Sequence, residues 1–321
     1  SRNYPQNIPY GPIWELHFIR MMEKIKIIDL NFQKSKDAIA SFLIETSDGP
    51  ILIETGPAST YDQLSRGVSK CGHSIDEIKH VLLTHIHFDH AGAAWKLAEA
   101  GAKIYVHPFG VPHLASPEKL WNSASQIYGD DMDRLWGKMK PIPANQLVSV
   151  EDKQELEFGT TKIKSLHTPG HAVHHIAWKM GDIIFTGDVA GVKIAGGPVM
   201  PPCPPPDINL EEWKKSLAII KSEKPKELYL THFGIIDVVD YHLDSLSYML
   251  DDWAEWIKPY FEKNVDQSEV VPLFMEYSKS QFLREGCSKE QIQTYEYANP
   301  SWMSVAGLYR YWKLKSQGRL K

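Results

Sequence analysis

The sequence predicts an α/β protein in which helices cover two facing β-sheets, with a helical region at its C-terminal end. In the first half, short apolar runs typical of strands alternate with helical stretches, which is the pattern of a layered fold. A second series of strand-like runs, similar in length and order, begins near residue 155. From about Val238, apolar residues recur every three or four positions, as they do along a helix.

The first half is expected to open with an antiparallel meander. Its strands are predicted at residues 25–30, 38–46 and 51–53, because Asp48-Gly49 between two apolar runs is a hairpin signal. Helices and strands then alternate. They are predicted in the order helix 61–71, strand 81–83, helix 91–100 and strand 103–106.

Residues 108–146 are predicted to form an insertion of helices and loops. Its aromatic side chains either line a pocket or form an ordinary small core. The second series of strands is predicted at 155–158, 162–166, 173–179 and 182–186, followed by a helix at 210–222 and a strand at 227–230.

The proline-dense segment 196–206 is predicted to be a rigid loop, because proline fixes φ and removes a backbone donor. It closely follows Asp188, so we expect it at the rim of the site that Asp188 serves. A polyproline ligand for a partner domain is the alternative interpretation.

The chain is predicted to consist of a leader (1–24), a catalytic domain (25–237) and a C-terminal helical region (238–321). In the last part, Ser288 to Gln291 has the capping-box pattern, and Asn299-Pro300 is typical of a helix start. The leader is either native or vector-derived. Its aromatic residues indicate docking on its own domain or on a second subunit, so a homodimer is one of two alternatives.

Composition excludes several classes of partner. The net charge is −5 and no run of Lys or Arg stands out, so nucleic acid is not expected to bind. No apolar run reaches the roughly 20 residues of a membrane helix. The three cysteines lack a CxxC spacing, which favours a reducing cytoplasm over a disulfide framework.

Polar side chains that bind metals follow four predicted strands. His85, His87, Asp89 and His90 fall within six residues directly after an apolar run. Single candidates follow three later strands, namely His171, Asp188 and His232. Strand ends at one edge of a sheet assembly lie close together, and imidazole and carboxylate suit zinc and its neighbours. Five histidines and two aspartates are enough for two metal ions.

The segment His85-Ile-His-Phe-Asp-His90, followed in order by His171, Asp188 and His232, resembles the metallo-β-lactamase fold superfamily. Within it, the pattern of these residues is most similar to that of the glyoxalase II-like hydrolases. This resemblance implies an αββα sandwich with the site at one edge. It also implies two divalent ions, with zinc favoured and iron or manganese as alternatives.

The resemblance assigns roles to the seven residues. It implies that the first ion is held by His85, His87 and His171, and the second by Asp89, His90 and His232. Asp188 is expected to bridge the two ions, and Asp89 and Asp188 are the expected catalytic carboxylates. A hydroxide shared by the ions would attack an ester-like carbonyl.

The resemblance also bears on other residues near the motif. His175 is expected to support the site, whereas His107 and His167 are expected to be structural. His174 replaces a small residue of the family, and it either tightens the site or points away. Glu54 stands where the family has aspartate, which leaves its role open.

The expected activity is hydrolysis of a small ester, thioester or lactone. A phosphodiester hydrolase of the same fold and a ligand-binding or regulatory member with little turnover are the alternatives. Flavodiiron proteins are disfavoured, because they carry glutamate in place of His87 and an added flavin domain. The substrate itself is not predicted.

Overall fold

The computed structural model describes residues 24–320. Apart from Lys24, the predicted leader lies outside the described residues, so its docking stays a prediction.

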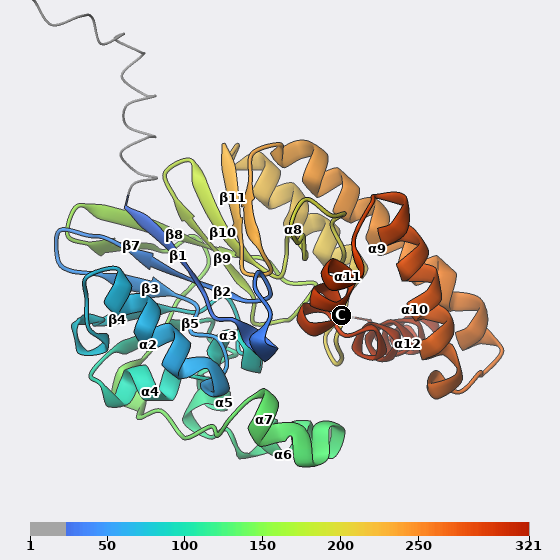
Figure 1. The fold of residues 1–321 in the computed structure, drawn as a ribbon, viewed down its shortest axis with the longest axis horizontal. Helices are drawn as coiled ribbons and strands as arrows, with labels where there is room; N and C mark the ends of the chain where they lie inside the picture. Colours follow the sequence, from blue (N-terminus) through green and yellow to red (C-terminus); the bar gives the residue numbers. More distant parts are fainter. Residues whose placement is uncertain (1–23, 321) are drawn as a thin grey trace, which may run out of the picture.

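Two six-stranded sheets face each other (Figure 1). The first sheet has the order β1 (Ile25–Asp29), β2 (Ala40–Ile44), β3 (Ile51–Ile53), β4 (His80–Leu82), β5 (Lys103–Val106) and β6 (Leu147–Ser149). The second has the order β12 (Gly234–Ile236), β11 (Glu227–Leu230), β10 (Ile183–Gly187), β9 (Ile176–Met180), β8 (Thr161–His167) and β7 (Glu155–Phe158). The predicted antiparallel meander is confirmed in β1 to β3. The short strands β6 and β12 were not predicted.

Side chains alternate between the two faces of each strand, and this alternation builds the layers. Phe42, Ile53, Trp178, Phe185 and Tyr229 point into the space between the sheets and are almost fully buried. Burying a large apolar side chain contributes roughly 1.5–3 kcal/mol. The opposite faces are covered by helices, among them α2 (Tyr61–Lys70) and α4 (Ala94–Glu99) on the first sheet and α8 (Leu210–Ser222) on the second. The predicted αββα sandwich is therefore confirmed.

The segment between β5 and β6 is helical, as predicted. It contains α5 (Val111–Ala115), α6 (Glu118–Tyr128) and α7 (Met132–Leu135). Ala124 and Met132 form a small core with Phe88, the residue between His87 and Asp89. The insertion is thereby packed directly against the predicted metal-binding motif.

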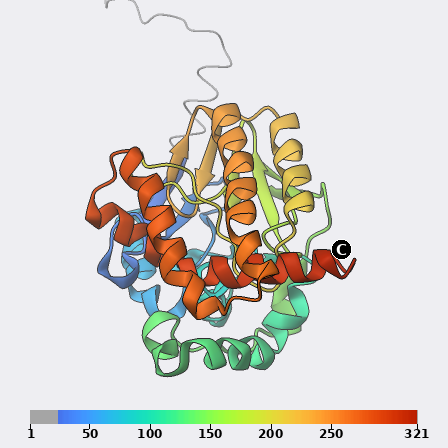
Figure 2. The same cartoon turned by 90° about the vertical axis from the view of Figure 1, so that its right-hand side faces the viewer.

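Four helices follow β12 (Figure 2). They are α9 (Val239–Glu262), α10 (Gln267–Arg284), α11 (Lys289–Ala298) and α12 (Ser301–Ser316). The predicted capping box at Ser288 and Gln291 is present at the start of α11. Leu246, Trp253 and Leu308 of these helices belong to the same hydrophobic core as Leu230 of the second sheet. The C-terminal helices thus share a core with the sandwich.

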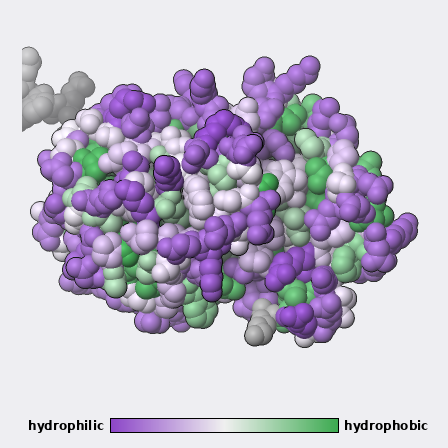
Figure 3. Space-filling view, turned by 90° about the horizontal axis from the view of Figure 1, so that it is seen from below, coloured by the Kyte–Doolittle hydropathy of each residue, from purple (hydrophilic) through white to green (hydrophobic). Residues whose placement is uncertain are grey.

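The molecular surface seen in Figure 3 is largely hydrophilic, with hydrophobic residues scattered among polar ones. None of the helices within residues 24–320 combines the length and the apolar character that a membrane span requires.

His242 fixes the start of α9 to the sandwich. Its ring is buried, and Nε2 donates a hydrogen bond of 2.7 Å to the carbonyl of Ala190. Burial lowers the pKa of His242 to about 4, although the bond to Ala190 opposes this shift. The folded protein therefore keeps the ring neutral at pH values at which the unfolded chain takes up a proton.

We expect the His242 contribution to stability to be lost as the pH falls from about 6.5 towards 4. The loss is up to roughly 3 kcal/mol, at 1.36 kcal/mol per pKa unit. A His242→Gln variant keeps a donor but cannot ionise, so urea unfolding between pH 7.5 and 4.5 should show a smaller loss of stability than in the wild type. His113→Gln, at an exposed histidine, is the control. Equal pH dependence of His242→Gln and the wild type would contradict the assignment.

Candidate metal centre

The predicted ligands lie at the ends of strands that meet at one edge of the sandwich. His85 comes three residues after β4 ends, and His171 comes four residues after β8 ends. β10 and β11 are parallel neighbours, so Asp188 and His232, which follow them, lie side by side. The structure brings all seven predicted residues together in two clusters. Their role as metal ligands stays a prediction.

A short helix, α3 (Phe88–Ala91), begins directly after His87. The backbone carbonyl of His87 accepts hydrogen bonds from the N–H groups of His90 and Ala91, at 3.0 and 2.9 Å. This single turn brings Asp89 and His90 back towards the strand ends. One short stretch of chain therefore supplies side chains to both clusters.

The first cluster consists of His85, His87 and His171. Nδ1 of His87 lies 3.0 Å from Nε2 of His85 and 3.1 Å from Nε2 of His171. Three ring nitrogens thus converge on one point.

The second cluster consists of Asp89, His90 and His232, with Asp188 beside them. Nε2 of His232 lies 3.3 Å from Nε2 of His90 and 3.1 Å from Oδ2 of Asp89. Nitrogen and oxygen atoms again converge, and here a carboxylate is among them.

Asp188 lies between the clusters and directs one oxygen to each. Oδ2 is 3.2 Å from Nε2 of His171 and 3.9 Å from Nε2 of His85. Oδ1 is 3.2 Å from Nε2 of His90 and 3.3 Å from Nε2 of His232. The carboxylate therefore spans the two clusters.

Hydrogen bonds on the far side of three rings set which nitrogen faces the site. Nδ1 of His171 lies 2.8 Å from the carbonyl of Pro202, and Nδ1 of His232 lies 2.7 Å from the carbonyl of Ala38. A carbonyl can only accept, so both Nδ1 atoms carry hydrogen. Nδ1 of His90 likewise faces the carboxylate of Glu54. The Nε2 atoms of the neutral rings then present lone pairs to the site, which is the arrangement of metal-binding histidines.

Burial and charge act differently on the two clusters. Burial lowers the pKa of His85 well below its ordinary value and that of His171 to about 4. At His90, burial also opposes protonation, but the carboxylates of Asp188, Asp89 and Glu54 outweigh it and raise the pKa. The pKa of His232 is raised in the same way by Asp188 and Asp89. Without a cation, protons on these two rings balance the buried carboxylates.

The donor set fits divalent cations. Oδ1 of Asp188 is buried and lies 3.2 and 3.3 Å from Nε2 of His90 and His232. When these rings are neutral with hydrogen on Nδ1, they offer this ionised oxygen no donor, which is costly. In the first cluster, a hydrogen on Nδ1 of His87 could bond to only one or two of its neighbours at 3.0 and 3.1 Å, whereas a cation could accept lone pairs from all three ring nitrogens at once. A divalent ion in each cluster would satisfy both requirements, and nitrogen and oxygen donors without thiolate suit zinc, iron or manganese.

Glu54 supports the site from behind. Its buried carboxylate accepts hydrogen bonds from the backbone N–H of Thr84 at 2.8 Å and from the hydroxyls of Thr84 and Thr231 at 3.1 and 3.2 Å. It also contacts Nδ1 of His90. Glu54 therefore links the ends of β3, β4 and β11 to one predicted ligand, which resolves the role that the sequence left open.

His175 and His174 have different positions. Nε2 of His175 accepts from the backbone N–H of Asp188 at 3.2 Å, and its Nδ1 is paired with the Thr168 hydroxyl at 2.8 Å. It thus supports Asp188, as expected. His174 is also buried, with its ring 5.6 Å from that of His87, and burial lowers its pKa. His174 therefore packs beside the first cluster and does not point away.

The carbonyl groups of Pro202 and Ala38 are functional groups that sequence analysis missed. Every residue has a carbonyl, so no residue type marks the ones that orient a ligand. The proline-rich segment was placed at the rim of the site from its position alone. It in fact contacts His171 directly.

The sequence is similar to one protein family and to several of its members. Residues 36–232 match the Metallo-beta-lactamase superfamily. A "Metallo-beta-lactamase fold-containing protein ST1585" of Sulfurisphaera tokodaii is 31% identical over 54% of this chain and 67% of its own length. An "Atrochrysone carboxyl ACP thioesterase" of Aspergillus fumigatus is 26% identical over 64% of this chain. A "Probable polyketide biosynthesis zinc-dependent hydrolase PksB" of Bacillus subtilis is 26% identical over 46% of it. The match spans only 39% and 52% of the last two proteins, respectively.

Two solved structures have the same fold. The archaeal ST1585 from Sulfolobus tokodaii aligns with a TM-score of 0.57 at 25% identity, over 68% of this chain and 84% of its own. The metallo-beta-lactamase family protein TTHA1429 from Thermus thermophilus aligns with a TM-score of 0.62 at 19% identity, over 92% of this chain and 94% of its own. The second match extends the similarity in fold to the C-terminal helices.

Proposed function

This chain belongs to the metallo-beta-lactamase superfamily, and from that premise we propose that it is a binuclear-metal hydrolase of an ester, thioester or lactone. One observation carries the proposal: Asp188 directs one carboxylate oxygen to each of two ligand clusters. A carboxylate placed in this way can bridge two ions, whereas a single-metal site does not require its two oxygens to face separate ligand clusters.

The proposed ligand sets are those predicted from the sequence. His85, His87 and His171 would hold one ion, Asp89, His90 and His232 would hold the other, and Asp188 would contribute one oxygen to each. Two bound divalent ions supply a water nucleophile of lowered pKa and positive charge for the developing oxyanion. We propose zinc as the metal, which the name of the zinc-dependent relative PksB supports, with iron and manganese as alternatives for the same donors.

The substrate is proposed to approach from the side of His87 and Asp89. These two side chains are partly exposed, whereas the other five proposed ligands are buried. Phe88 lies between them in sequence. The centroid of its ring is 6.1 Å from that of Trp121 and 6.0 Å from that of Trp136. Phe88 is buried, but Trp121 and Trp136 are partly exposed, and we propose that these two side chains receive an apolar acyl group next to the metal centre.

Polar groups on the same surface could orient that substrate. Trp136 Nε1 is buried and has no hydrogen-bond partner in the described range, so it would donate to a substrate oxygen once neighbouring side chains move to admit the substrate. Burial, together with the nearby carboxylate of Asp89, raises the pKa of Tyr128, so its phenol stays protonated. The thioesterase relative supports an acyl substrate of this general kind.

Zinc binding and a substrate screen test the proposal together. We expect the wild-type protein to bind two zinc ions and to hydrolyse at least one of three probes: a p-nitrophenyl ester, an acyl thioester and a lactone. His87→Ala should lose one ion and lower kcat/KM by roughly 100- to 1000-fold, the loss typical of removing one group that stabilises the transition state. His113→Ala, which changes an exposed histidine, is the control and should keep both properties.

Different failures have different meanings. Undiminished hydrolysis by His87→Ala would contradict the metal-dependent mechanism. Turnover of bis-p-nitrophenyl phosphate alone would identify a phosphodiesterase. Two bound zinc ions without turnover of any probe would identify a ligand-binding member of the family.

We further propose that residues 25–237 are the catalytic unit, with the insertion at about 108–146, and that residues 238–321 are a helical extension of it. Small-molecule substrates and a cytoplasmic location belong to the same proposal. Cys71, Cys203 and Cys287 are all free thiols, which supports a reducing compartment. Gel filtration with light scattering would decide between a monomer and the predicted alternative of a homodimer.

A further inference from the structure

We infer that Asn299 and Ser304 are positioning residues for His171, and that they act through the proline-rich loop. The C-terminal helices would then support one half of the metal centre without supplying any ligand. This inference rests on the proposed function, because it concerns metal binding at the same site.

The chemistry of the loop makes it dependent on outside partners. Residues 201–206 read Pro-Pro-Cys-Pro-Pro-Pro, so Cys203 has the only backbone N–H among them. This single N–H cannot satisfy the six carbonyl groups of residues 201–206, so they need hydrogen-bond donors from other parts of the chain. Pro201, Pro202 and Cys203 are nevertheless buried, and buried backbone groups require hydrogen-bond partners.

Asn299 and Ser304 supply those partners on both sides of Pro202. The Asn299 amide donates to the carbonyl of Pro201 at 3.2 Å. The Cys203 N–H donates to the hydroxyl of Ser304 at 3.3 Å, and that hydroxyl donates in turn to the Asn299 side-chain oxygen at 3.2 Å. Both side chains are buried. The three bonds close a ring around Pro202.

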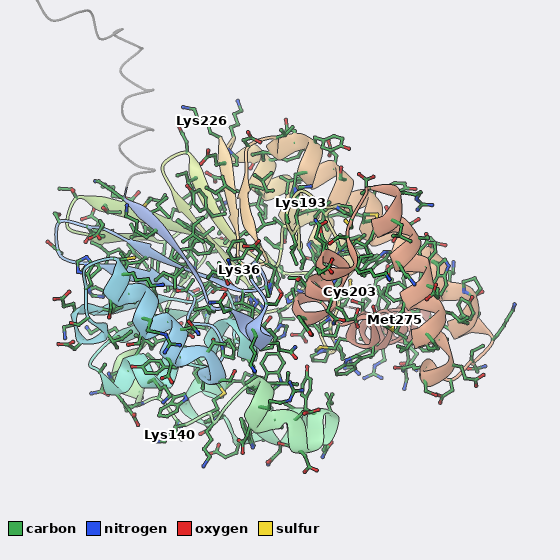
Figure 4. The ribbon with its side chains drawn as sticks, in the orientation of Figure 1. Lys36, Lys140, Lys193, Cys203, Lys226 and Met275 are labelled. Carbon is green, nitrogen blue, oxygen red and sulfur yellow. The ribbon has the colours of Figure 1, made fainter. Side chains whose placement is uncertain are left out.

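Close packing of α12 on the loop makes this ring rigid. A Cβ atom at Gly307 would lie 1.8 Å from the carbonyl oxygen of Cys203, so the helix touches the loop backbone. Figure 4 shows Cys203 where the loop meets the C-terminal helices. Nε of Arg310 adds a bond of 2.9 Å to the carbonyl of Pro206.

The Pro202 carbonyl held in this way accepts the hydrogen bond from Nδ1 of His171. The rings of the second cluster have other supports, because His232 is paired with Ala38 and His90 with Glu54. Neither of these supports belongs to the C-terminal helices. Loosening the ring around Pro202 should therefore affect the first cluster alone.

Zinc affinity of the full chain tests this separation. We expect Asn299→Ala and Ser304→Ala to bind two zinc ions, one with wild-type affinity and the other roughly 10- to 100-fold more weakly in chelator competition, the usual loss when a group that orients a ligand is removed. Ser304→Thr keeps the hydroxyl and should restore much of the affinity. Circular dichroism verifies folding. If Ser304→Ala does not fold, Ser304→Cys replaces it, because a thiol is close to a hydroxyl in size but accepts hydrogen bonds only weakly.

Tyr295→Phe is the matched control. The Tyr295 hydroxyl also joins these helices to the same loop, by donating to Pro198 at 2.6 Å and accepting from Ile194 at 3.0 Å, but it does not flank Pro202. It should lose stability and keep both zinc affinities. Wild-type affinities in the two alanine variants, or equal losses in Tyr295→Phe, would overturn the inference. A wild-type protein that binds fewer than two zinc ions would instead contradict the proposed function.

Discussion

Asp188→Asn is expected to lower kcat/KM by about 1000-fold, which is the upper end of the loss on removing one electrostatic group from an active site. The substitution keeps the size of the side chain but removes its charge and turns one oxygen into an N–H donor. Because the two oxygens face different clusters, the amide can serve one cluster only. Zinc content measured by mass spectrometry should fall from two ions to one or fewer.

Asp182→Asn makes the same chemical change at a half-exposed aspartate that pairs with Lys226 at 3.0 Å. It should keep both zinc ions and wild-type kinetics. If Asp188→Asn retained two ions and activity within tenfold of the wild type, Asp188 would not be the bridge between the clusters.

Glu54→Ala is expected to lower the free energy of unfolding of the metal-free protein by roughly 3–5 kcal/mol, the range for breaking a buried charged network. The substitution would leave four donors without their acceptor: the N–H and hydroxyl of Thr84, the hydroxyl of Thr231 and Nδ1 of His90. Glu54 also has a φ of 67°, a left-handed conformation that costs roughly 1–2 kcal/mol and that these bonds stabilise. Urea denaturation monitored by circular dichroism would measure the change.

The conservative variant Glu54→Asp should lose less stability, because a carboxylate remains but its reach is one methylene shorter. Glu45→Ala is the control near the surface, since Glu45 pairs with His73 at 2.9 Å where both side chains are partly exposed to solvent, and such pairs contribute about 1 kcal/mol or less. Equal losses in Glu45→Ala and Glu54→Ala would show that the buried network contributes little.

Much of the fold could be predicted from the sequence, because hydrophobic periodicity reports which face of an element is buried. The bounds of β3, β5, β7, β11 and α8 agree with those predicted. The strands β6 and β12 were missed. β3 is equally short, but its three residues are apolar and fully buried and follow the Asp48-Gly49 hairpin signal. β6 and β12 each contain Ser or Gly and are only partly buried, so their three residues give no clear apolar signal.

The proposed ligands of the candidate site could be predicted from the sequence, but the groups that hydrogen-bond to these ligands and orient them could not. His, Asp and their spacing after apolar strands are visible in the sequence, and the structure brings those residues together. What orients them depends on the path of the chain, as the carbonyls of Ala38 and Pro202 show. In the sequence, Glu54 is distinguished only by its departure from the family pattern, whereas in the structure its carboxylate joins Thr84 and Thr231 at the ends of two strands.

The ring around Pro202 also has a consequence for the order of events during synthesis. The ribosome makes all seven proposed ligands before it reaches Asn299 and Ser304, because His232 is the last of them in the chain. A nascent chain that has emerged as far as β12 can already place Glu54 and Ala38 behind the second cluster. The support of His171 has to wait for α12, so the second cluster can mature cotranslationally, whereas the first is completed only after the C-terminal helices dock.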